Sequence, residues 1–230
     1  IMHPVDIVED IAIGFGFRNL PVKLSTTHLD ALPLKSAHLK RRVGESMRAC
    51  GLQEVQSLTL SNERDQFENV RWPNEGYITE IANPITSDHT LLRQYILPSL
   101  LRLLAANRHH ELPQRIYELG DVIRDSKNFQ RAAWACAEVG SGFTSSKGIV
   151  QALLRDMGAI QDDVVFRATD AEDGPWISGR GSHVFIQEEK IGEFGEIDPK
   201  VSGFFGIKSP IQAGEIDLEA IYRIVPDPIS

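Results

Sequence analysis

Three carboxylates stand close together near the start of the chain, in the stretch HPVDIVEDIAIGFGF. Asp6, Glu9 and Asp10 lie at offsets of zero, three and four. On a helix, residues at these offsets share one face. Such a face is either a solvated acidic side that complements the helix dipole, or part of an oxygen-ligand site for a hard divalent cation. The pattern alone favours the solvated side.

Other residue patterns that carry chemistry are weaker. The stretch GSGFTSSKG contains Lys147 but lacks the residue order of a P-loop, so it is expected to be an ordinary strand-to-helix turn. His109 and His110 are adjacent and do not share a helical face, which argues against a metal site. Cys50 and Cys136 lie far apart, which indicates neither a zinc site nor a disulfide framework and is typical of a reducing compartment.

The composition is that of an ordinary globular protein. The 230 residues are 42% hydrophobic and 24% charged, and no apolar run is long enough to span a membrane. A formal net charge of −8 argues against a self-sufficient nucleic-acid binder. It fits a part of a larger assembly in the cytoplasm. The first residues lack a basic signal-peptide region and enter a helical pattern at once, so we expect a piece of a longer subunit.

Hydrophobic spacing and turn residues predict helices alternating irregularly with strands. Helices are expected over residues 4–13, 37–51, 97–110, 145–159 and 219–225, with Gly14 ending the first. Strands are expected over residues 54–60, 77–84, 114–126, 131–140, 163–169, 183–197 (a hairpin) and 210–218. Because no strand–helix–strand unit repeats, this order favours an α+β fold with a mostly antiparallel sheet.

Three segments in order carry the strongest signal. They are IANPITSDHTLLRQYILPSLLRLLAANRHH, LPQRIYELGDVI with Glu118, and AGEIDLEAIYRI. They resemble degenerate forms of the three motifs of class II aminoacyl-tRNA synthetases. Together with GLQEVQSLTLSN, GRGSHVFI and IGEFGEIDP, their order resembles the β subunit of phenylalanyl-tRNA synthetase of the archaeal and eukaryotic type, over essentially the whole chain.

The resemblance implies an architecture and partners. Residues 25–230 are expected to form a class II synthetase-like core, an antiparallel sheet flanked by helices. Residues 1–24 are expected to be the C-terminal remnant of a winged-helix-like module and the start of a linker. The implied partners are the α subunit, in an α2β2 assembly, and tRNA(Phe). In this family the α subunit binds ATP and phenylalanine and makes the adenylate, and no membrane is involved.

The motif residues predict that this core is not catalytic. A class II site needs an arginine two residues before the motif 2 carboxylate, but Ile116 holds that position before Glu118. Arg115 is one residue further away and faces the other side of a strand. In the third segment, no glycine-containing motif leads to an arginine. Instead it holds three carboxylates that would repel ATP: Glu215, Asp217 and Glu219.

The first motif implies a subunit interface. In class II enzymes this segment forms the dimer contact, and its apolar residues suit burial against a partner. Some of them are expected to pack within the domain. The residues assigned to the interface are Ile81, Pro84, Leu92, Ile96, Pro98, Leu100 and Leu101.

The resemblance also changes the interpretation of the first three carboxylates. It implies a Mg²⁺ ion shared with the α subunit, for which Asp6, Glu9 and Asp10 match three ligands. The fourth ligand would precede Ile1, so the site is expected to be incomplete and empty in this chain.

Two other functions stay open at this stage. A free-standing class II-like ligase would use Arg115, Arg180 and Arg223 on ATP, and predicts that the isolated chain binds ATP. A tRNA-binding module would use the stretch HLKRR, and predicts an affinity that falls steeply with salt.

Overall fold

The computed structural model describes residues 1–23, 34–140, 142–170 and 173–225. The chain divides into two compact units, Ile1–Pro33 and Leu34–Ser230. The domain boundary expected between residues 24 and 25 lies outside the described residues. In the described part of the chain, no helix is long and apolar enough to cross a membrane.

The first unit contains helix α1 (Pro4–Phe15) and the 3₁₀ turn η1 (Phe17–Asn19). A capping box begins the helix: the His3 ring accepts a bond from the backbone N–H of Val5, while Asp6 bonds back to the His3 N–H. The helix was expected to end at Gly14, which is wrong. It ends at Gly16, whose φ of 88° lets its N–H reach the carbonyls of the last turn.

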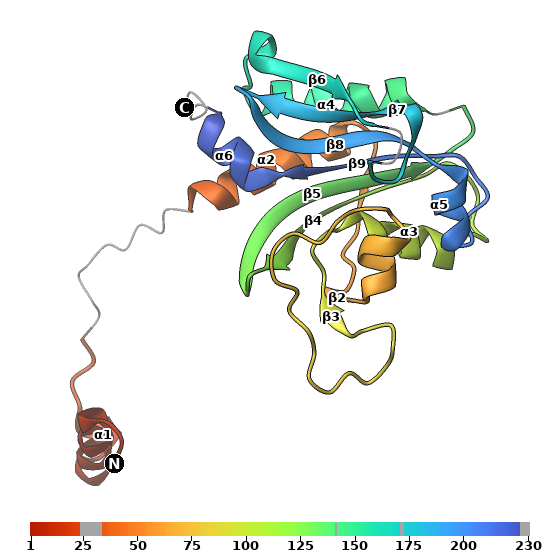
Figure 1. The fold of residues 1–230 in the computed structure, drawn as a ribbon. Helices are drawn as coiled ribbons and strands as arrows, with labels where there is room; N and C mark the ends of the chain where they lie inside the picture. Colours follow the sequence, from red (N-terminus) through yellow and green to blue (C-terminus); the bar gives the residue numbers. More distant parts are fainter. Residues whose placement is uncertain (24–33, 141, 171–172, 226–230) are drawn as a thin grey trace. The chain divides into compact units, whose positions relative to one another are not determined.

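The second unit is built on a seven-stranded sheet with the order β1-β4-β5-β9-β8-β7-β6 (Figure 1). Among the described strands of this sheet, only β1 and β4 pair in parallel; the other neighbours are antiparallel. This confirms the α+β fold with a mostly antiparallel sheet. The strands are β1 (Gln53–Glu54), β4 (Gln114–Arg124), β5 (Lys127–Ala137), β6 (Val164–Ala168), β7 (Trp176–Ile186), β8 (Glu189–Ile197) and β9 (Ile211–Asp217).

Helices cover both faces of this sheet. One face packs against α2 (Lys35–Ala49), α4 (Phe143–Asp156) and α6 (Leu218–Ile224), and the other against α3 (Leu97–Ala106) and α5 (Pro199–Phe204) (Figure 1). Alternation along β5 separates the two cores: Trp134 and its i±2 neighbours belong to the first, whereas Ala133 and Ala135 belong to the second. The turn η3 (Gln161–Asp163) leads into β6.

Two expected strands are wrong in extent. Residues 54–60 form only the end of β1 and the start of β2 (Leu60–Ser61), because the Ser57 backbone N–H bonds to a side chain, Glu118, and leaves the ladder. Residues 77–84 form only one bridge, Glu80 to Leu91, beside β3 (Leu91–Leu92). The irregular helix η2 (Arg64–Glu68) lies between these two segments, and no periodicity in the sequence predicted it.

Candidate functional site

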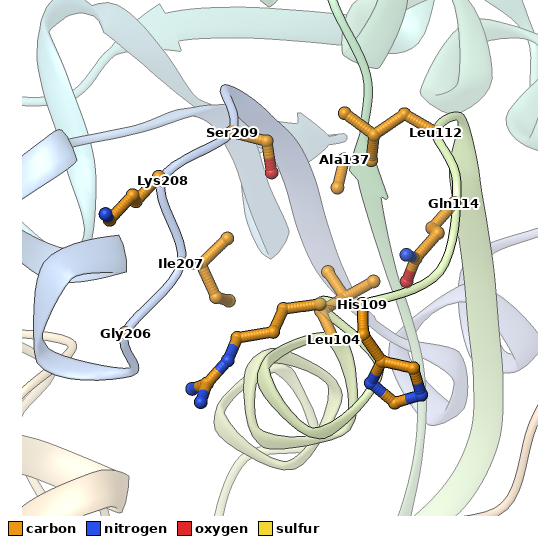
Figure 2. A pocket seen from close by; sticks show the side chains of 10 residues that line it. Leu104, His109, Leu112, Gln114, Ala137, Gly206, Ile207, Lys208 and Ser209 are labelled. Carbon is orange, nitrogen blue, oxygen red and sulfur yellow. The ribbon is translucent and has the colours of Figure 1, made fainter.

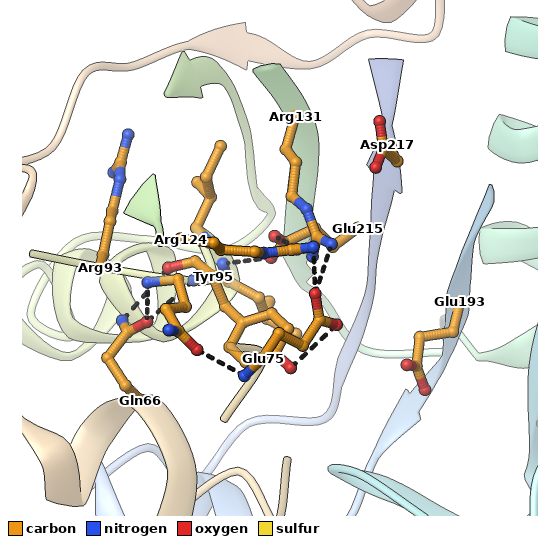
Figure 3. A network of polar contacts seen from close by, with 12 residues as sticks. Gln66, Glu75, Arg93, Tyr95, Arg124, Arg131, Glu193, Glu215 and Asp217 are labelled. Atoms are coloured by element: carbon orange, nitrogen blue, oxygen red, sulfur yellow. Dashed lines mark hydrogen bonds and ion pairs between the residues drawn. The ribbon is translucent and has the colours of Figure 1, made fainter. Parts of the chain in front are cut away.

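A set of buried and half-buried polar side chains lies on the α3 face of the sheet, where the three motif-like segments meet (Figure 3). We call it the polar network. It joins residues from β4, β5 and β9 to the segment before β2, the segment between β2 and β3, and the segment after β3. Its members are Ser57, Gln66, Glu75, Arg93, Gln94, Tyr95, Glu118, Arg124, Arg131 and Glu215.

At one end of the network, Arg93 and Glu118 form a fully buried ion pair. Their side chains are each 2% exposed, and Nη2 lies 2.6 Å from Oε1. Arg93 also donates to Ser57 Oγ at 2.8 Å and to the Asp121 carbonyl at 3.0 Å. The other Glu118 oxygen accepts the N–H and hydroxyl of Ser57. Gly120 makes room for the pair, since a Cβ there would lie 2.8 Å from Glu118 Oε1. We call this the closed end.

Amide side chains connect the two ends. The carbonyl oxygen of Gln66 accepts the backbone N–H groups of Gln94 and Tyr95, both at 2.9 Å. Gln94 in turn accepts the N–H of Glu75 at 2.7 Å. The turn that carries Glu75 is held by Asp125, whose carboxylate accepts the Tyr77 N–H at 2.6 Å. These bonds fix where the Glu75 carboxylate lies.

At the other end, Glu215 and Arg131 meet Glu75. Glu215 accepts the N–H groups of Ile96 and Leu97 at the start of α3, both at 2.9 Å, and Arg131 at 3.2 Å. Arg131 and Arg124 both pair with Glu75. We call this the open end.

Burial and charge oppose each other in this region. Burial raises the pKa of Glu215, and Arg131 acts against that shift. Burial opposes the charge of Arg131, but Glu215 and Glu75 outweigh it, so the pKa of Arg131 is raised and the side chain stays cationic. Burial also raises the pKa of the neighbouring Tyr95 hydroxyl, which stays protonated and donates to the Pro73 carbonyl at 2.7 Å.

The sequence-based expectation about the motif 2 positions agrees with the observed side-chain environments. Ile116 belongs to the hydrophobic core of the α3 face, on the side of β4 that also carries Glu118. Arg115 points elsewhere and bonds to Glu138, with Nε 2.7 Å from Oε2. The other two arginines of the ligase alternative are paired as well, Arg180 with Glu196 and Arg223 with Glu189. The structure does not bring these three arginines together.

The three carboxylates of the third motif have separate structural tasks. Glu215 belongs to the polar network. Asp217 caps α6 by accepting the N–H groups of Glu219 and Ala220 at 2.9 and 3.1 Å. Glu219 accepts the backbone N–H of Gln130 at 3.3 Å. These three carboxylates are close in the sequence because each one anchors the junction between β9 and α6.

The predicted interface residues divide into two groups. The four on α3 and just before it are buried inside this chain. They are Ile96, Pro98, Leu100 and Leu101. Pro84 is exposed, and Ile81 and Leu92 are half-buried beside β3. Of the predicted interface residues, Ile81, Pro84 and Leu92 are therefore the accessible ones.

The predicted magnesium ligands lie on α1. Asp6 Oδ2 accepts the N–H groups of Met2 at 2.8 Å and of His3 at 3.1 Å, and these bonds, led by that from His3, lower the pKa of Asp6. Glu9 and Asp10 are exposed. Among the described residues, no group of three or more His, Cys, Asp or Glu side chains is arranged to hold a metal ion. These three residues therefore do not fit a magnesium site by themselves.

A cavity of about 640 Å³ at the end of α3 is lined by apolar and polar residues, among them Arg108, His109 and Lys208 (Figure 2). The stretch HLKRR is a weaker RNA candidate, because Arg42 donates to the Asp156 carbonyl and Arg41 contacts its neighbour on the helix. No observation here favours the RNA-binding alternative over the others.

Comparison with known proteins decides the family. A family model described as the phenylalanyl tRNA synthetase beta chain CLM domain matches residues 20–218. The chain belongs to this family. It is 33% identical to the phenylalanine–tRNA ligase beta subunit of Archaeoglobus fulgidus over 224 residues, and 35% identical to that of Pyrococcus horikoshii over 230 residues. These matches cover 96% and 97% of this chain but 40% of each relative, so the chain spans less than half of their length.

A solved synthetase has the same fold. The pyrrolysyl tRNA synthetase PylSc of Desulfitobacterium hafniense aligns with a TM-score of 0.63 at 14% identity, over 83% of this chain and 68% of that one. This is consistent with the class II-like fold expected from the motifs. The family model and the relatives confirm the phenylalanyl-tRNA synthetase β family assignment, and the remnant of a winged-helix-like module stays a prediction.

Sequence reasoning missed most of the polar network. Arg93 gives the best available signal, because a charged residue inside the apolar stretch LLRQYIL needs a buried partner. The sequence around Glu75 and Arg131 has no pattern that marks a buried site, and nothing in the spacing of the two residues predicts that they pair.

Proposed function

We propose that this chain is the non-catalytic synthetase-like core of a phenylalanyl-tRNA synthetase β subunit. It pairs with an α subunit, in an α2β2 assembly, that makes phenylalanyl-adenylate and charges tRNA(Phe). The enzyme activity then belongs to the complex in the cytoplasm, and this core contributes structure and not reacting groups. The family membership supports the β-subunit role.

One observation carries the non-catalytic part of the proposal: the arginines of the network are already neutralised. Arg93 is paired with Glu118, Arg124 with Glu75, and Arg131 with both Glu75 and Glu215. Adenylate formation develops negative charge on a phosphate and needs fixed cations that face it. Cations that are already paired with carboxylates of this chain do not supply that field.

Calorimetry with ATP and Mg²⁺ tests this part directly. The 230-residue chain is expected to give no binding heat, whereas a purified α subunit measured in parallel binds ATP. Micromolar ATP binding by the 230-residue chain would overturn the non-catalytic assignment in favour of the ligase alternative. Loss of that binding in Arg115→Gln would then assign the site.

Co-purification with the α subunit tests the pairing. Ile81→Asp places a charge in the half-buried part of the predicted interface and is expected to reduce recovery of the complex severalfold. Ile160→Asp is the matched control, because Ile160 is 59% exposed and lies just beyond the C-terminal end of α4. Equal recovery of α with both variants, in chains that unfold at the same temperature, would contradict the interface.

The magnesium ion is a separate proposal. Because Asp6, Glu9 and Asp10 do not form a site alone, it requires further oxygen ligands from the α subunit or from other parts of a longer β subunit. We expect Asp10→Asn in the full αβ complex to weaken the stabilisation of the complex by Mg²⁺, measured as its dissociation temperature with and without EDTA. An unchanged Mg²⁺ effect would leave these residues as a solvated acidic face.

A further inference from the structure

Strand β6 forms one edge of the seven-stranded sheet, and its outer side pairs with no other strand that the structure describes (Figure 1). The opposite edge, β1, is 2 residues long, and such short edge strands limit pairing with other chains. β6 is 5 residues long and pairs with β7 without a register shift. It contains no proline and one charged residue, Arg167. It therefore lacks most of the features by which edge strands avoid pairing.

The backbone of β6 presents hydrogen-bonding groups to this open side. In an antiparallel ladder, the N–H and C=O of one residue both point to the same neighbouring strand, and the next residue points both to the other side. The Asp163 carbonyl accepts the Gln187 N–H at 3.3 Å, and the Thr169 N–H donates to the Gly181 carbonyl at 3.2 Å. Odd-numbered residues therefore bond towards β7, and the even-numbered residues of β6 point their backbone groups outward.

The apolar side chains of β6 lie on both faces of the sheet. Val164 and Phe166 pack against the core of the α4 face and are half-buried. Val165 lies on the other face and is 43% exposed. A strand added at this edge would therefore cover apolar surface on both faces, in addition to bonding the backbone.

Two charged residues on the Val165 face are available for pairing. Arg167 lies over the Phe185 ring at 4.4 Å, and in the described part of the chain it pairs with no carboxylate. Asp163, just before β6, accepts one long side-chain bond, from Gln187 Nε2 at 3.4 Å. Asp163 and Arg167 lie two residues to either side of Val165, so the strand has an anion and a cation placed symmetrically about its exposed valine.

This symmetry selects the partner and the register. When β6 pairs antiparallel with β6 of a second copy around Val165, Val165 faces itself and Val164 faces Phe166 of the second copy. Asp163 then faces Arg167 of the second copy, an opposite-charge pair across the strands. A shift of the register by two residues in either direction keeps the backbone bonds but places an uncharged residue opposite Arg167.

We propose that β6 pairs with β6 of a second copy of this chain, in an antiparallel register centred on Val165. The pairing continues the sheet across a twofold axis, with backbone bonds exchanged between the outer sides of the two strands. One Asp163–Arg167 pair lies on each side of the axis. The contact goes beyond the proposed pairing with the α subunit, because β6 contains none of the residues assigned to that interface.

Sedimentation equilibrium of the 230-residue chain, without an α subunit, tests the contact. We expect a reversible monomer–dimer equilibrium as the concentration is raised to about 1 mM. Val165→Lys places two like charges face to face on the axis and is expected to weaken dimerisation by on the order of tenfold. Val165→Thr keeps an uncharged β-branched side chain at the same position and is expected to dimerise nearly as well as the unaltered chain.

Exchanging the charges tests the pairing of Asp163 with Arg167. Arg167→Glu faces Asp163 of the second copy with a like charge and is expected to weaken dimerisation severalfold. Adding Asp163→Lys to that variant restores opposite charges and is expected to recover most of the lost affinity. Lys127→Glu makes the same change in net charge at an exposed residue of β5, away from the edge, and is expected to dimerise normally.

Engineered cysteines test the register. Val165 and its copy form a pair without backbone bonds between them, with Cα atoms about 4.5 Å apart, which suits a disulfide. Val165→Cys is therefore expected to give a covalent dimer on mild oxidation. Arg167→Cys is the matched control, because its copy lies four residues away along the strand, about 13 Å. The native cysteines, half-buried Cys50 and buried Cys136, are present in both variants.

Four results would overturn the proposal: a chain that stays monomeric up to about 1 mM, equal dimerisation of Val165→Lys and Val165→Thr, no recovery in the charge exchange, or equal cross-linking at residues 165 and 167. A monomeric chain would assign the edge to a different occupant, such as another part of a longer subunit. None of these results affects the α pairing, which is measured by recovery of the α subunit. Conversely, loss of α pairing in Ile81→Asp leaves the self-association of this chain intact.

Discussion

The closed and open ends of the polar network both remove charged side chains from water, and they compensate the lost hydration in different ways. At the closed end, Arg93 and Glu118 are 2% exposed, and Ser57 and the Asp121 carbonyl take up their remaining bonds. At the open end, Arg124 and Arg131 share Glu75, which is 39% exposed, and keep buried donors without acceptors. The same residue types are fully satisfied in one place and partly satisfied in the other.

This difference separates a fully bonded ion pair from a partly bonded one. A buried ion pair that is completely bonded has no capacity left for a ligand, and it specifies how the segments around it pack. A partly bonded group retains donors whose desolvation is not yet compensated. The two ends therefore differ in how completely the desolvation of their charges is compensated, and the variants below test the two ends separately.

The largest effect is expected from breaking the closed end. Glu118→Ala leaves the Arg93 guanidinium buried without its carboxylate, and loss of one partner of a buried pair costs about 3–5 kcal/mol. Urea unfolding of the 230-residue chain measures this. We expect the midpoint to fall sharply with an unchanged slope, because the surface exposed on unfolding stays the same.

Removing both partners is the control for that experiment. Arg93→Met combined with Glu118→Leu leaves no unpaired charge, so the double variant is expected to be more stable than Glu118→Ala alone. If instead Glu118→Ala costs less than about 1 kcal/mol, as exposed ion pairs do, the closed end is not the buried, fully bonded unit described above.

A smaller effect is expected at the open end. Glu75→Gln keeps an acceptor for the Tyr95 hydroxyl but removes the charge that Arg124 and Arg131 share. Because Glu75 is partly exposed and Glu215 still holds Arg131, we expect a loss of about 1–2 kcal/mol in the same urea assay. A loss as large as that of Glu118→Ala would show that the two ends are equivalent and would contradict the comparison.

The parts of the fold that sequence predicted are those decided locally. The hairpin of β4 and β5 was expected as two antiparallel strands joined by a polar turn, although the turn is formed by Asp125 and Ser126, with φ of 50° and 59°, and not by residues 127–130 as expected. Helix α3 was expected from its apolar side and from Pro98 in its first turn. Each of these rests on residues within one turn or one pair of strands.

The errors arise where a distant side chain overrides the local pattern. Residues 54–60 alternate as a strand should, but Glu118 takes the Ser57 N–H that a neighbouring strand would need. At the candidate site, the two-residue side-chain period of a strand correctly placed Ile116 and Arg115 on opposite faces of β4. It could not pair Arg131 with Glu75, because 56 residues separate them and no periodicity spans that distance.

The smallest expected effect is the pH response of His183, which lies 3.9 Å from Glu193 beside the open end. Burial and Lys190 lower the pKa of His183, while Glu193, Asp173 and Asp170 oppose that shift. A histidine whose folded pKa lies below the ordinary value of 6.5 binds protons more readily when unfolded. Stability is then complete above pH 6.5 and falls as the pH drops through 6.5 towards the folded pKa.

Thermal unfolding from about pH 8 to about pH 5 measures this contribution. His183→Gln is expected to lose slightly less stability on acidification than the unaltered chain, and the exposed His110→Gln to lose the same amount as the unaltered chain. If the unaltered chain instead gains stability relative to His183→Gln as the pH falls, the carboxylates outweigh burial and Lys190. Glu193 would then already hold a cation of its own, the protonated His183.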